Sequence, residues 1–347
     1  MNLRALLLSF ILLAGPLYAR DKTDVMVMKN GDRITCAVKG LEGGVLYVEV
    51  DYVDGTASVD WSKVARLESK QLFYVKTEDG SVYTGTLSTS ETTAGQPVRI
   101  HVVEAAEKEA VIEASRIVRM TATSENVWER FDGDVSFGVI YNKGNQSTQY
   151  SLGSTTDYIR ERWGATAGFD SNLSSSTGVN VSTRNLVYLN AYRWLPGNHW
   201  YYSGLSSFLQ SSEQGIDLQS TFGGGVGRYL TNTNFVSVKI LGGLAWQNTS
   251  YQQSNASPNL TAALISADVK LFRFSKTNLA LTAAFFPALS DPGRVRFNTN
   301  TTYYIKLFSN LKWNLSFYGN WDNRPPPGLS GSDYGTSSGV SWTFGLR

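Results

Sequence analysis

Apolar side chains alternate with small or polar ones over most of residues 126–347. Val135, Phe137 and Val139 show this pattern near its beginning, and Leu315 and Phe317 show it near its end. A period of two residues indicates β-strands with one apolar face. The sequence therefore predicts an all-β fold, with strands at about 132–142, 146–159, 161–171, 179–194, 199–211, 215–230, 234–247, 260–274, 277–287, 296–308, 310–322 and 334–346.

Most of these segments reach the 9–11 residues that a tilted strand needs to cross a bilayer. Strands can cross lipid only in a closed barrel, because an open edge would leave backbone groups unpaired. Residues 1–125 hold 14 Lys and Arg and 17 Asp and Glu, whereas the 222 residues that follow hold only 17 and 12. This depletion of charge fits an outer face that meets lipid. We predict an antiparallel transmembrane β-barrel of about 12 strands at residues 126–347.

A secreted β-sandwich is the soluble alternative, since its strands also alternate. A sandwich would normally carry more charge, and it would not need Trp and Tyr near so many strand ends. Eight of the nine Trp residues follow residue 125.

The gaps between the predicted strands also alternate in length. Gaps at 248–259, 288–295 and 323–333 are long and polar, whereas those at 195–198 and 231–233 are short. Outer-membrane barrels have short periplasmic turns and longer outer loops. A segment that precedes the first strand is then expected on the periplasmic side.

Both ends of the chain resemble export signals. Arg4, the apolar run from Ala5 to Ala14 and a small-residue site before Arg20 predict a signal peptide at residues 1–19, cleaved between Ala19 and Arg20. The last strand resembles the C-terminal targeting signal of outer-membrane barrels, with Gly339, Trp342 and Phe344 at the matching positions, although three residues follow the Phe.

Residues 20–125 contain an internal repeat. Asn30-Gly31 and Asp79-Gly80 each lie between two strand-like runs, and the two glycines are 49 residues apart. Each copy closes on a similar segment, at residues 61–67 and 114–120. We predict two copies of one small, SH3-like β unit that pack against each other, since each would be marginal alone.

Several segments resemble the salt-induced outer-membrane protein family of Gram-negative bacteria, a β-barrel domain of unknown function. The first is the stretch at 133–138 with 143–148 after it, and the second is the glycine-rich stretch at 222–230. The leading β module also resembles one found in larger members. The resemblance covers about residues 130–310 and implies location and fold, but no activity.

The sequence offers few groups for catalysis or metal binding. One Cys and two His exclude a disulfide framework and leave little for a zinc site, so we expect no metal and no cofactor. The rival to a non-enzymatic barrel is an outer-membrane lipid hydrolase with His199 and Ser203 as its catalytic pair. His199 would then lie at a periplasmic turn, and the Gly-x-His-x-Ser context of such enzymes is missing, so no catalysis is expected.

Charged residues of both signs are expected on the inner faces of the strands. Such mixed charges favour a hydrogen-bonded, largely closed lumen over a wide pore. They are Asp134, Asp157, Arg162, Asp170, Asp217, Lys239, Asp268, Lys270, Lys306 and Lys312.

The predicted role is an outer-membrane barrel with a structural function in the envelope or in small-solute passage, or a barrel that anchors a periplasmic adaptor. Its expected partners are outer-membrane lipid, the barrel assembly machinery and periplasmic chaperones during biogenesis, with a further envelope component for residues 20–125. A net charge of +2 gives no reason to expect nucleic acid.

Overall fold

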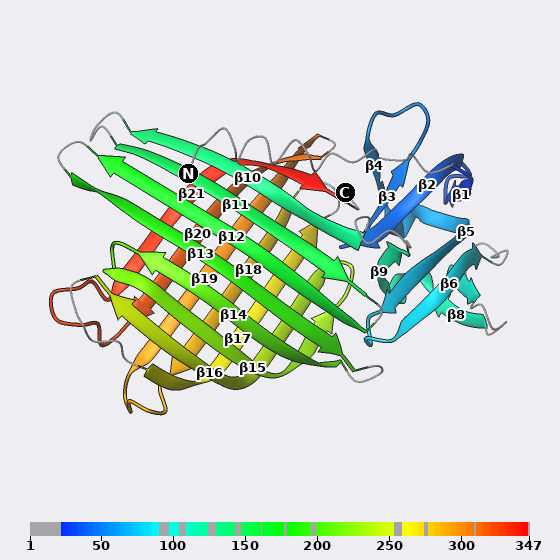
Figure 1. The fold of residues 1–347 in the computed structure, drawn as a ribbon. Coiled ribbons are helices and arrows are strands. Elements are labelled where there is room, and N and C mark those ends of the chain that lie inside the picture. Colours follow the sequence, from blue (N-terminus) through cyan, green and yellow to red (C-terminus); the bar gives the residue numbers. More distant parts are fainter. Residues whose placement is uncertain are drawn as a thin grey trace.

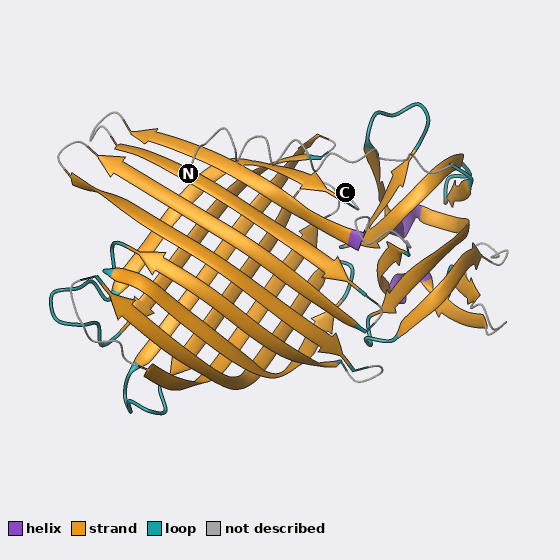
Figure 2. Cartoon of the chain, in the orientation of Figure 1, coloured by secondary structure: helices purple, strands orange, loops and turns teal. Residues whose placement is uncertain are grey.

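The computed structural model describes residues 22–89, 97–103, 109–123, 130–142, 147–160, 162–176, 179–195, 199–252, 259–273, 277–308 and 310–345. These residues form strands and two short 3₁₀ helices, η1 (Trp61–Lys63) and η2 (Ala114–Arg116) (Figure 2). A large barrel and a smaller β module lie end to end (Figure 1). None of the residues described here belongs to a helix of the length and hydropathy that crossing a membrane requires.

The barrel confirms the predicted fold and strand number. Each strand pairs antiparallel with the next, and the last pairs with the first, where Phe137 lies opposite Val340. Gly339, Trp342 and Phe344 therefore lie in the strand that closes the barrel. The twelve strands are β10 (Phe131–Asn142), β11 (Ser147–Ile159), β12 (Trp163–Ser176), β13 (Val179–Trp194), β14 (Trp200–Ser211), β15 (Ile216–Asn232), β16 (Val236–Tyr251), β17 (Asn259–Arg273), β18 (Thr277–Pro287), β19 (Val295–Phe308), β20 (Leu311–Asp322) and β21 (Ser332–Phe344).

Some strands continue into segments that the sequence assigned to loops. β16 runs to Tyr251, so the loop predicted to begin at residue 248 begins at residue 252. The polar residues at this end of β16 bond inside the barrel: Gln247 Nε2 donates to Thr221 Oγ1 over 3.2 Å. Their polarity reflects a polar lumen and does not mark the end of the strand.

The outer face of the barrel is apolar. Phe137, Leu152, Leu189, Leu244 and Ile265 each expose between 47% and 59% of their surface. Exposed aromatic residues gather near both ends of the strands, at positions 163, 200, 202 and 342 at one end and 150, 321 and 334 at the other.

Closely spaced glycines form the wall of the barrel where β14, β15 and β16 meet. A Cβ on Gly225 would lie 2.2 Å from the carbonyl oxygen of Gly242, and one on Gly243 would lie 2.1 Å from that of Gly224. Only glycine fits such close backbone approaches. The glycine-rich stretch thus lets the strands of this wall approach each other closely.

The module contains two copies of one arrangement of strands, which meet within β5. In the first copy, the N-terminal strand pairs with β2 and with the first half of β5; in the second, the other half of β5 pairs with β6 and β9. The turns at Gly31 and Gly80 have positive φ, which glycine tolerates. The strands are β1 (Asp24–Met28), β2 (Arg33–Glu42), β3 (Val45–Glu49), β4 (Thr56–Asp60), β5 (Val64–Thr77), β6 (Val82–Thr89), β7 (Arg99–Val103), β8 (Glu109–Glu113) and β9 (Ile117–Ala122).

The two copies interlock. The last strand of each copy also pairs with the second strand of the other, so that Gly40 of β2 lies opposite Thr121 and Leu87 of β6 lies opposite Ser69. Trp61 Nε1 donates to the carbonyl oxygen of Ala114 over 2.7 Å and joins their closing segments. One apolar core runs through both copies, so they form a single folded unit.

Candidate functional site

The module docks on the end of the barrel that carries the shorter turns (Figure 1). In the turn between β15 and β16, Asn234 Nδ2 donates to the carbonyl oxygen of Ile117 over 2.9 Å. Farther around the rim, Lys306 Nζ of β19 donates to Ser58 Oγ of β4. The docked module therefore holds the barrel rim at more than one point. We call this the module end and the opposite one the loop end.

Lys76 of the module reaches into the barrel mouth. Its Nζ lies 3.8 Å from the ring centre of Trp194 and 5.1 Å from that of Tyr229. Tyr192 packs on Trp194 with ring centres 4.8 Å apart, and Tyr201 packs on Tyr229 at 5.4 Å. We call these four rings the aromatic cage. The ammonium group therefore sits where an aromatic wall from β13, β14 and β15 surrounds it.

Burial at this position changes the acid–base behaviour of Lys76. The pKa of Lys76 falls to about 8, mainly because burial removes its hydration; Tyr229 raises this pKa, whereas Arg119 and Lys239 lower it. The side chain is only 9% exposed. Lys76 is thus mostly protonated at neutral pH, and it loses its proton at a mildly alkaline pH at which proteins stay folded.

Arg119 of β9 also links the module to the barrel. Its guanidinium lies 3.6 Å from Glu42 of the module and 3.6 Å from Asp132 of β10. Burial alone would lower the pKa of Arg119, but Glu42 and Asp132 raise it above its usual value. A cation that bridges the two parts in this way fixes the module over the mouth.

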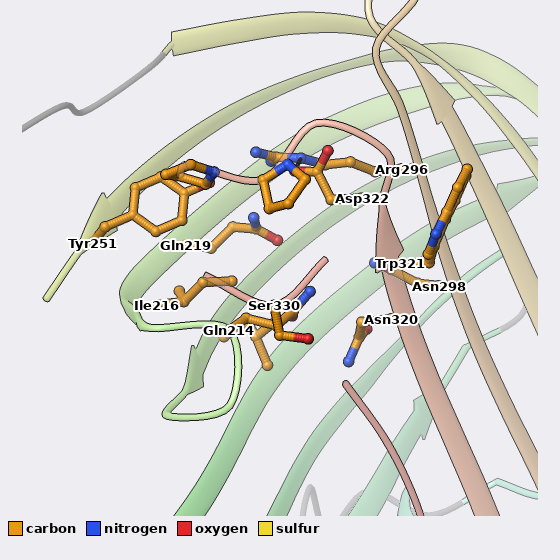
Figure 3. A pocket seen from close by; sticks show the side chains of 13 residues that line it. Gln214, Ile216, Gln219, Tyr251, Arg296, Asn298, Asn320, Trp321, Asp322 and Ser330 are labelled. Carbon is orange, nitrogen blue, oxygen red and sulfur yellow. Dashed lines mark hydrogen bonds and ion pairs between the residues drawn. The ribbon is translucent and has the colours of Figure 1, made fainter. Parts of the chain in front are cut away.

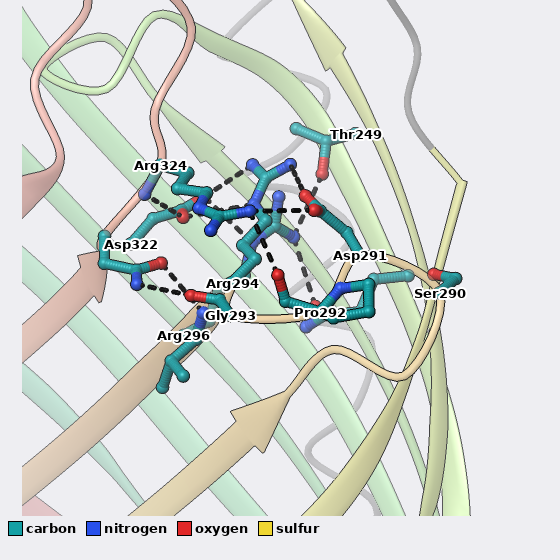
Figure 4. A network of polar contacts seen from close by, with 12 residues as sticks. Thr249, Ser290, Asp291, Pro292, Gly293, Arg294, Arg296, Asp322 and Arg324 are labelled. Carbon is teal, nitrogen blue, oxygen red and sulfur yellow. Dashed lines mark hydrogen bonds and ion pairs between the residues drawn. The ribbon is translucent and has the colours of Figure 1, made fainter.

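At the loop end, a network of arginines and carboxylates lies across the opening (Figure 4). Asp322 accepts from Arg294 Nη2 over 2.7 Å and from Arg296 Nε over 3.0 Å. Arg296 Nη1 also donates to Gln247 over 3.1 Å, which ties β19 to β16 across the lumen. Farther out in the loops, Arg324 Nη1 donates to Asp291 Oδ1 over 3.0 Å. The network crosslinks the long loops and narrows this end.

Beside the network lie two polar hollows. A small one, of about 20 Å³, is lined by Arg296, Gln219, Asn298 and Asn320, whose side chains converge in Figure 3. A larger cavity of about 480 Å³ is lined by six serines together with tyrosine, amide and charged side chains, among them Arg184. Arg184 lies 3.7 Å from Asp333 and covers the ring of Tyr318 at 4.3 Å. The loop end is thus a polar vestibule of the lumen.

The structure places most of the predicted lumen charges inside the barrel. Lys239 pairs with Asp268 over 3.5 Å, and Thr166 donates to Asp157. Asp134 and Asp170 lie on the inner face, since their neighbours in the chain, Val135 and Phe169, lie on the outer face. Lys306 and Lys312 belong to the module end, where Lys312 lies 5.6 Å from the ring of Tyr304.

Arg162 was predicted wrongly. It lies in the turn between β11 and β12 and is exposed, because β12 begins at Trp163 rather than at residue 161. Asp217 and Lys270 are also exposed, near the two ends of their strands. The predicted cleavage site at Ala19 and Arg20 lies outside the described residues.

His199 and Ser203 are not brought together by a turn. His199 ends the turn before β14, and Ser203 lies four residues along the chain, about 13 Å away in an extended strand. Ser203 Oγ donates to the carbonyl oxygen of Ala191 over 3.3 Å. Among the described residues, no group of three His, Cys, Asp or Glu side chains could hold a metal ion, and Cys36 is buried in the module core.

The sequence did not single out Lys76, Arg119, Trp194 or Tyr229. Lys76 and Arg119 lie in ordinary strand patterns, where a cation is usually solvated. Lys76 becomes buried only by docking against rings that lie more than 100 residues later in the chain, and Arg119 bridges the module to the barrel strand β10. The one usable signal in the sequence was the position of Trp194 and Tyr229 near the ends of their strands. From sequence alone, aromatic residues at such positions indicate the membrane interface.

The fold is that of a closed, twelve-stranded antiparallel barrel with an apolar outer face and a polar lumen. Residues 135–344 match the family described as "Protein of unknown function, DUF481", and the chain belongs to that family. The more specific name expected from the sequence, the salt-induced outer-membrane proteins, stays a prediction. No curated protein matches the chain.

Several solved barrels are similar in outline. The NanC porin is 14% identical with a TM-score of 0.40, and the match covers 61% of this chain and all of that one. The translocator domain of the autotransporter NalP from Neisseria meningitidis is 14% identical with a TM-score of 0.34, over 62% of this chain and 87% of that one. A porin is 11% identical with a TM-score of 0.29, over 79% and 97%.

Proposed function

We propose that this chain is an outer-membrane barrel that its own N-terminal module closes, and that small solutes pass only when the module leaves the mouth. The observation that carries the proposal is Lys76, an ammonium of the module that lies inside the aromatic cage of the barrel. The module end would face the periplasm, since the shorter turns lie there.

The outer surface supports a membrane location. Apolar side chains cover the middle of the strands, and exposed Trp and Tyr residues such as Trp163, Trp342, Trp321 and Tyr334 lie near their ends. Aromatic girdles that flank an apolar band are a property of outer-membrane barrels. Outer-membrane fractionation, together with heat-modifiable migration of the unboiled protein, tests this location, and a soluble, non-shifting protein would contradict it.

Conductance of the full-length protein in planar bilayers tests the plug. Arg119→Glu would place a new carboxylate beside Glu42 and Asp132, so like charges would repel the module from the mouth. We expect wild type to stay closed and Arg119→Glu to show frequent openings. Arg66→Glu is the matched control, because it makes the same change of charge at a residue that pairs with Glu68 of its own strand. The barrel of this variant should stay closed.

Two results would contradict the proposal. One is steady conductance of wild type at the level of Arg119→Glu. The other is a closed Arg119→Glu barrel in which proteolysis shows that the module has been released, since the loop-end network would then be the permanent barrier.

The second candidate function is a barrel that anchors a periplasmic adaptor. Tyr52 is 76% exposed and Val53 is 43% exposed at the tip of the hairpin between β3 and β4. An apolar pair at a loop tip is suited to a protein partner. Loss of a co-purifying envelope protein in Tyr52→Ser, with unchanged membrane insertion, would favour this role, whereas identical pull-downs from both proteins would remove it.

A further inference from the structure

The aromatic cage at the module end is itself a binding site that the module occupies with its own side chain. Trp194 and Tyr229 contact the ammonium, and Tyr192 and Tyr201 support these rings from either side. All four rings come from strands of the barrel. The barrel therefore keeps the cage when the module leaves, and only the cation is lost.

The charges of the mouth favour a cation as the replacement. Around the cage, the barrel contributes three carboxylates, Asp132, Asp157 and Asp268, against the two ammonium groups of Lys239 and Lys270. The module contributes Lys76 and Arg119 against one carboxylate, Glu42. With the module docked, these four carboxylates and four cations balance, so removal of the module changes the net charge around the cage from 0 to −1 and leaves the aromatic faces in place.

We propose that the barrel mouth is a recognition site for small alkylammonium ions, and that Lys76 occupies it as an internal competitor. Aromatic faces attract ammonium groups through their quadrupoles, most strongly where water is excluded. The lysine stem fixes the size of the ligand, since it delivers a primary ammonium on an unbranched carbon chain. The inference rests on the proposed plug, because a solute reaches the cage freely only after Lys76 has left it.

Direct binding tests the site independently of conductance. The full-length protein in lipid nanodiscs would be mixed with n-butylammonium, which reproduces the Lys76 side chain, and followed by saturation-transfer difference NMR. We expect clear transfer with Lys76→Ala and affinity on the order of tenfold weaker in wild type, where the native ammonium competes. Trp194→Leu in the Lys76→Ala background should remove the transfer.

Uncharged n-butanol is the matched ligand control, and it should give no difference between Lys76→Ala and wild type. Equal saturation transfer to n-butylammonium from wild type, Lys76→Ala and the Trp194→Leu double variant would overturn the proposal. Saturation transfer to n-butanol that equals the transfer to n-butylammonium would overturn it too. Should Lys76→Ala lose its heat-modifiable migration, Lys76→Ser serves in its place with the same expectations.

The two proposals fail in different ways. Binding of n-butylammonium without any conductance of Arg119→Glu leaves the cation site intact and rejects solute passage. Conductance of Arg119→Glu without binding leaves the plug intact and rejects the cation site.

Discussion

Lys76 Nζ and the ring of Trp194 lie 3.8 Å apart, although the two residues belong to different folded units. This contact combines two opposing effects, since the ring attracts the ammonium while burial removes its water. Burial is the main reason that the pKa of Lys76 falls to about 8 from an ordinary value of 10.5.

Docking of the module should depend on pH. With the module free, Lys76 binds its proton up to about pH 10.5, whereas the docked state releases it near pH 8. The free state thus binds more protons between these values, so docking should weaken as pH falls from 10.5 to 8 and change little below. The measurement is the open probability in planar bilayers from pH 10 to pH 6. It should rise as the pH falls from 10 to 8 and change little from pH 8 to pH 6.

Lys76→Met isolates the contribution of Lys76 to this pH dependence. Tyr229, Arg119 and Lys239 face the same ammonium, and the variant retains all three. Its pH profile should therefore be flatter than that of wild type. Superimposable profiles would show that the neighbouring groups, and not Lys76, cause the dependence.

A disulfide between Gly44→Cys and Asn234→Cys should lock the module to the barrel. A Cβ on Gly44 would lie 3.4 Å from Cβ of Asn234, close to the separation found in disulfides. In the Arg119→Glu background we expect the oxidised protein to be closed and the reduced protein to conduct. The positive φ of Gly44 adds strain, so the bond should be easily reduced.

Gly44→Cys alone is the control for this lock, and it should conduct under both conditions in the same background. Cys36 is fully buried and does not compete for the new thiols. Conductance by the oxidised, cross-linked protein would mean that solutes pass around a docked module.

Asp322→Asn should destabilise the loop end. The carboxylate lies between Arg294 and Arg296, both buried, and its loss leaves two guanidinium groups side by side. We expect a cost of about 3 kcal/mol in the free energy of unfolding, measured by urea titration in lipid vesicles. Asp291→Asn, whose partner Arg324 is half exposed, should cost less than about 1 kcal/mol. Equal losses of unfolding free energy in the two variants would show that Asp322 does not hold the network together.

Two adjacent glycines of β16 should respond in opposite ways to alanine. The new methyl group of Gly243→Ala would meet the backbone of Gly224, so we expect a loss of about 1–3 kcal/mol in unfolding free energy. Gly242→Ala meets nothing within 4 Å and should be neutral or slightly stabilising. Equal effects in the same urea titration would mean that strand propensity, not the close approach to β15, governs this wall.

The sequence predicted the barrel well because its signal is local. A lipid-facing residue at every second position follows from the geometry of one strand, so Val135, Phe137 and Val139 reveal their face without knowledge of any partner. The same logic failed at strand ends. The sequence pattern assigns Thr249 to a loop, although this residue is buried in the lumen and its hydroxyl accepts a hydrogen bond from Arg296.

The site could not be predicted because it depends on docking between the two units. The position of Lys76 in a module strand carries no information about the ring of Trp194, which lies 118 residues later in the chain. The same holds for Asn234 and Ile117, whose hydrogen bond joins a barrel turn to β9. The repeat in the module indicated its internal architecture, but not which of its faces would meet the barrel.

The interlocked copies of the module resemble a strand-exchanged dimer joined into one chain. A single copy would leave the edges of β2 and β5 that now pair with β9 and β6 without partners. Unpaired edges of this kind recruit a second copy of the same chain. Because one chain carries both copies, these edges find their partners within the chain, so folding of the module does not depend on protein concentration.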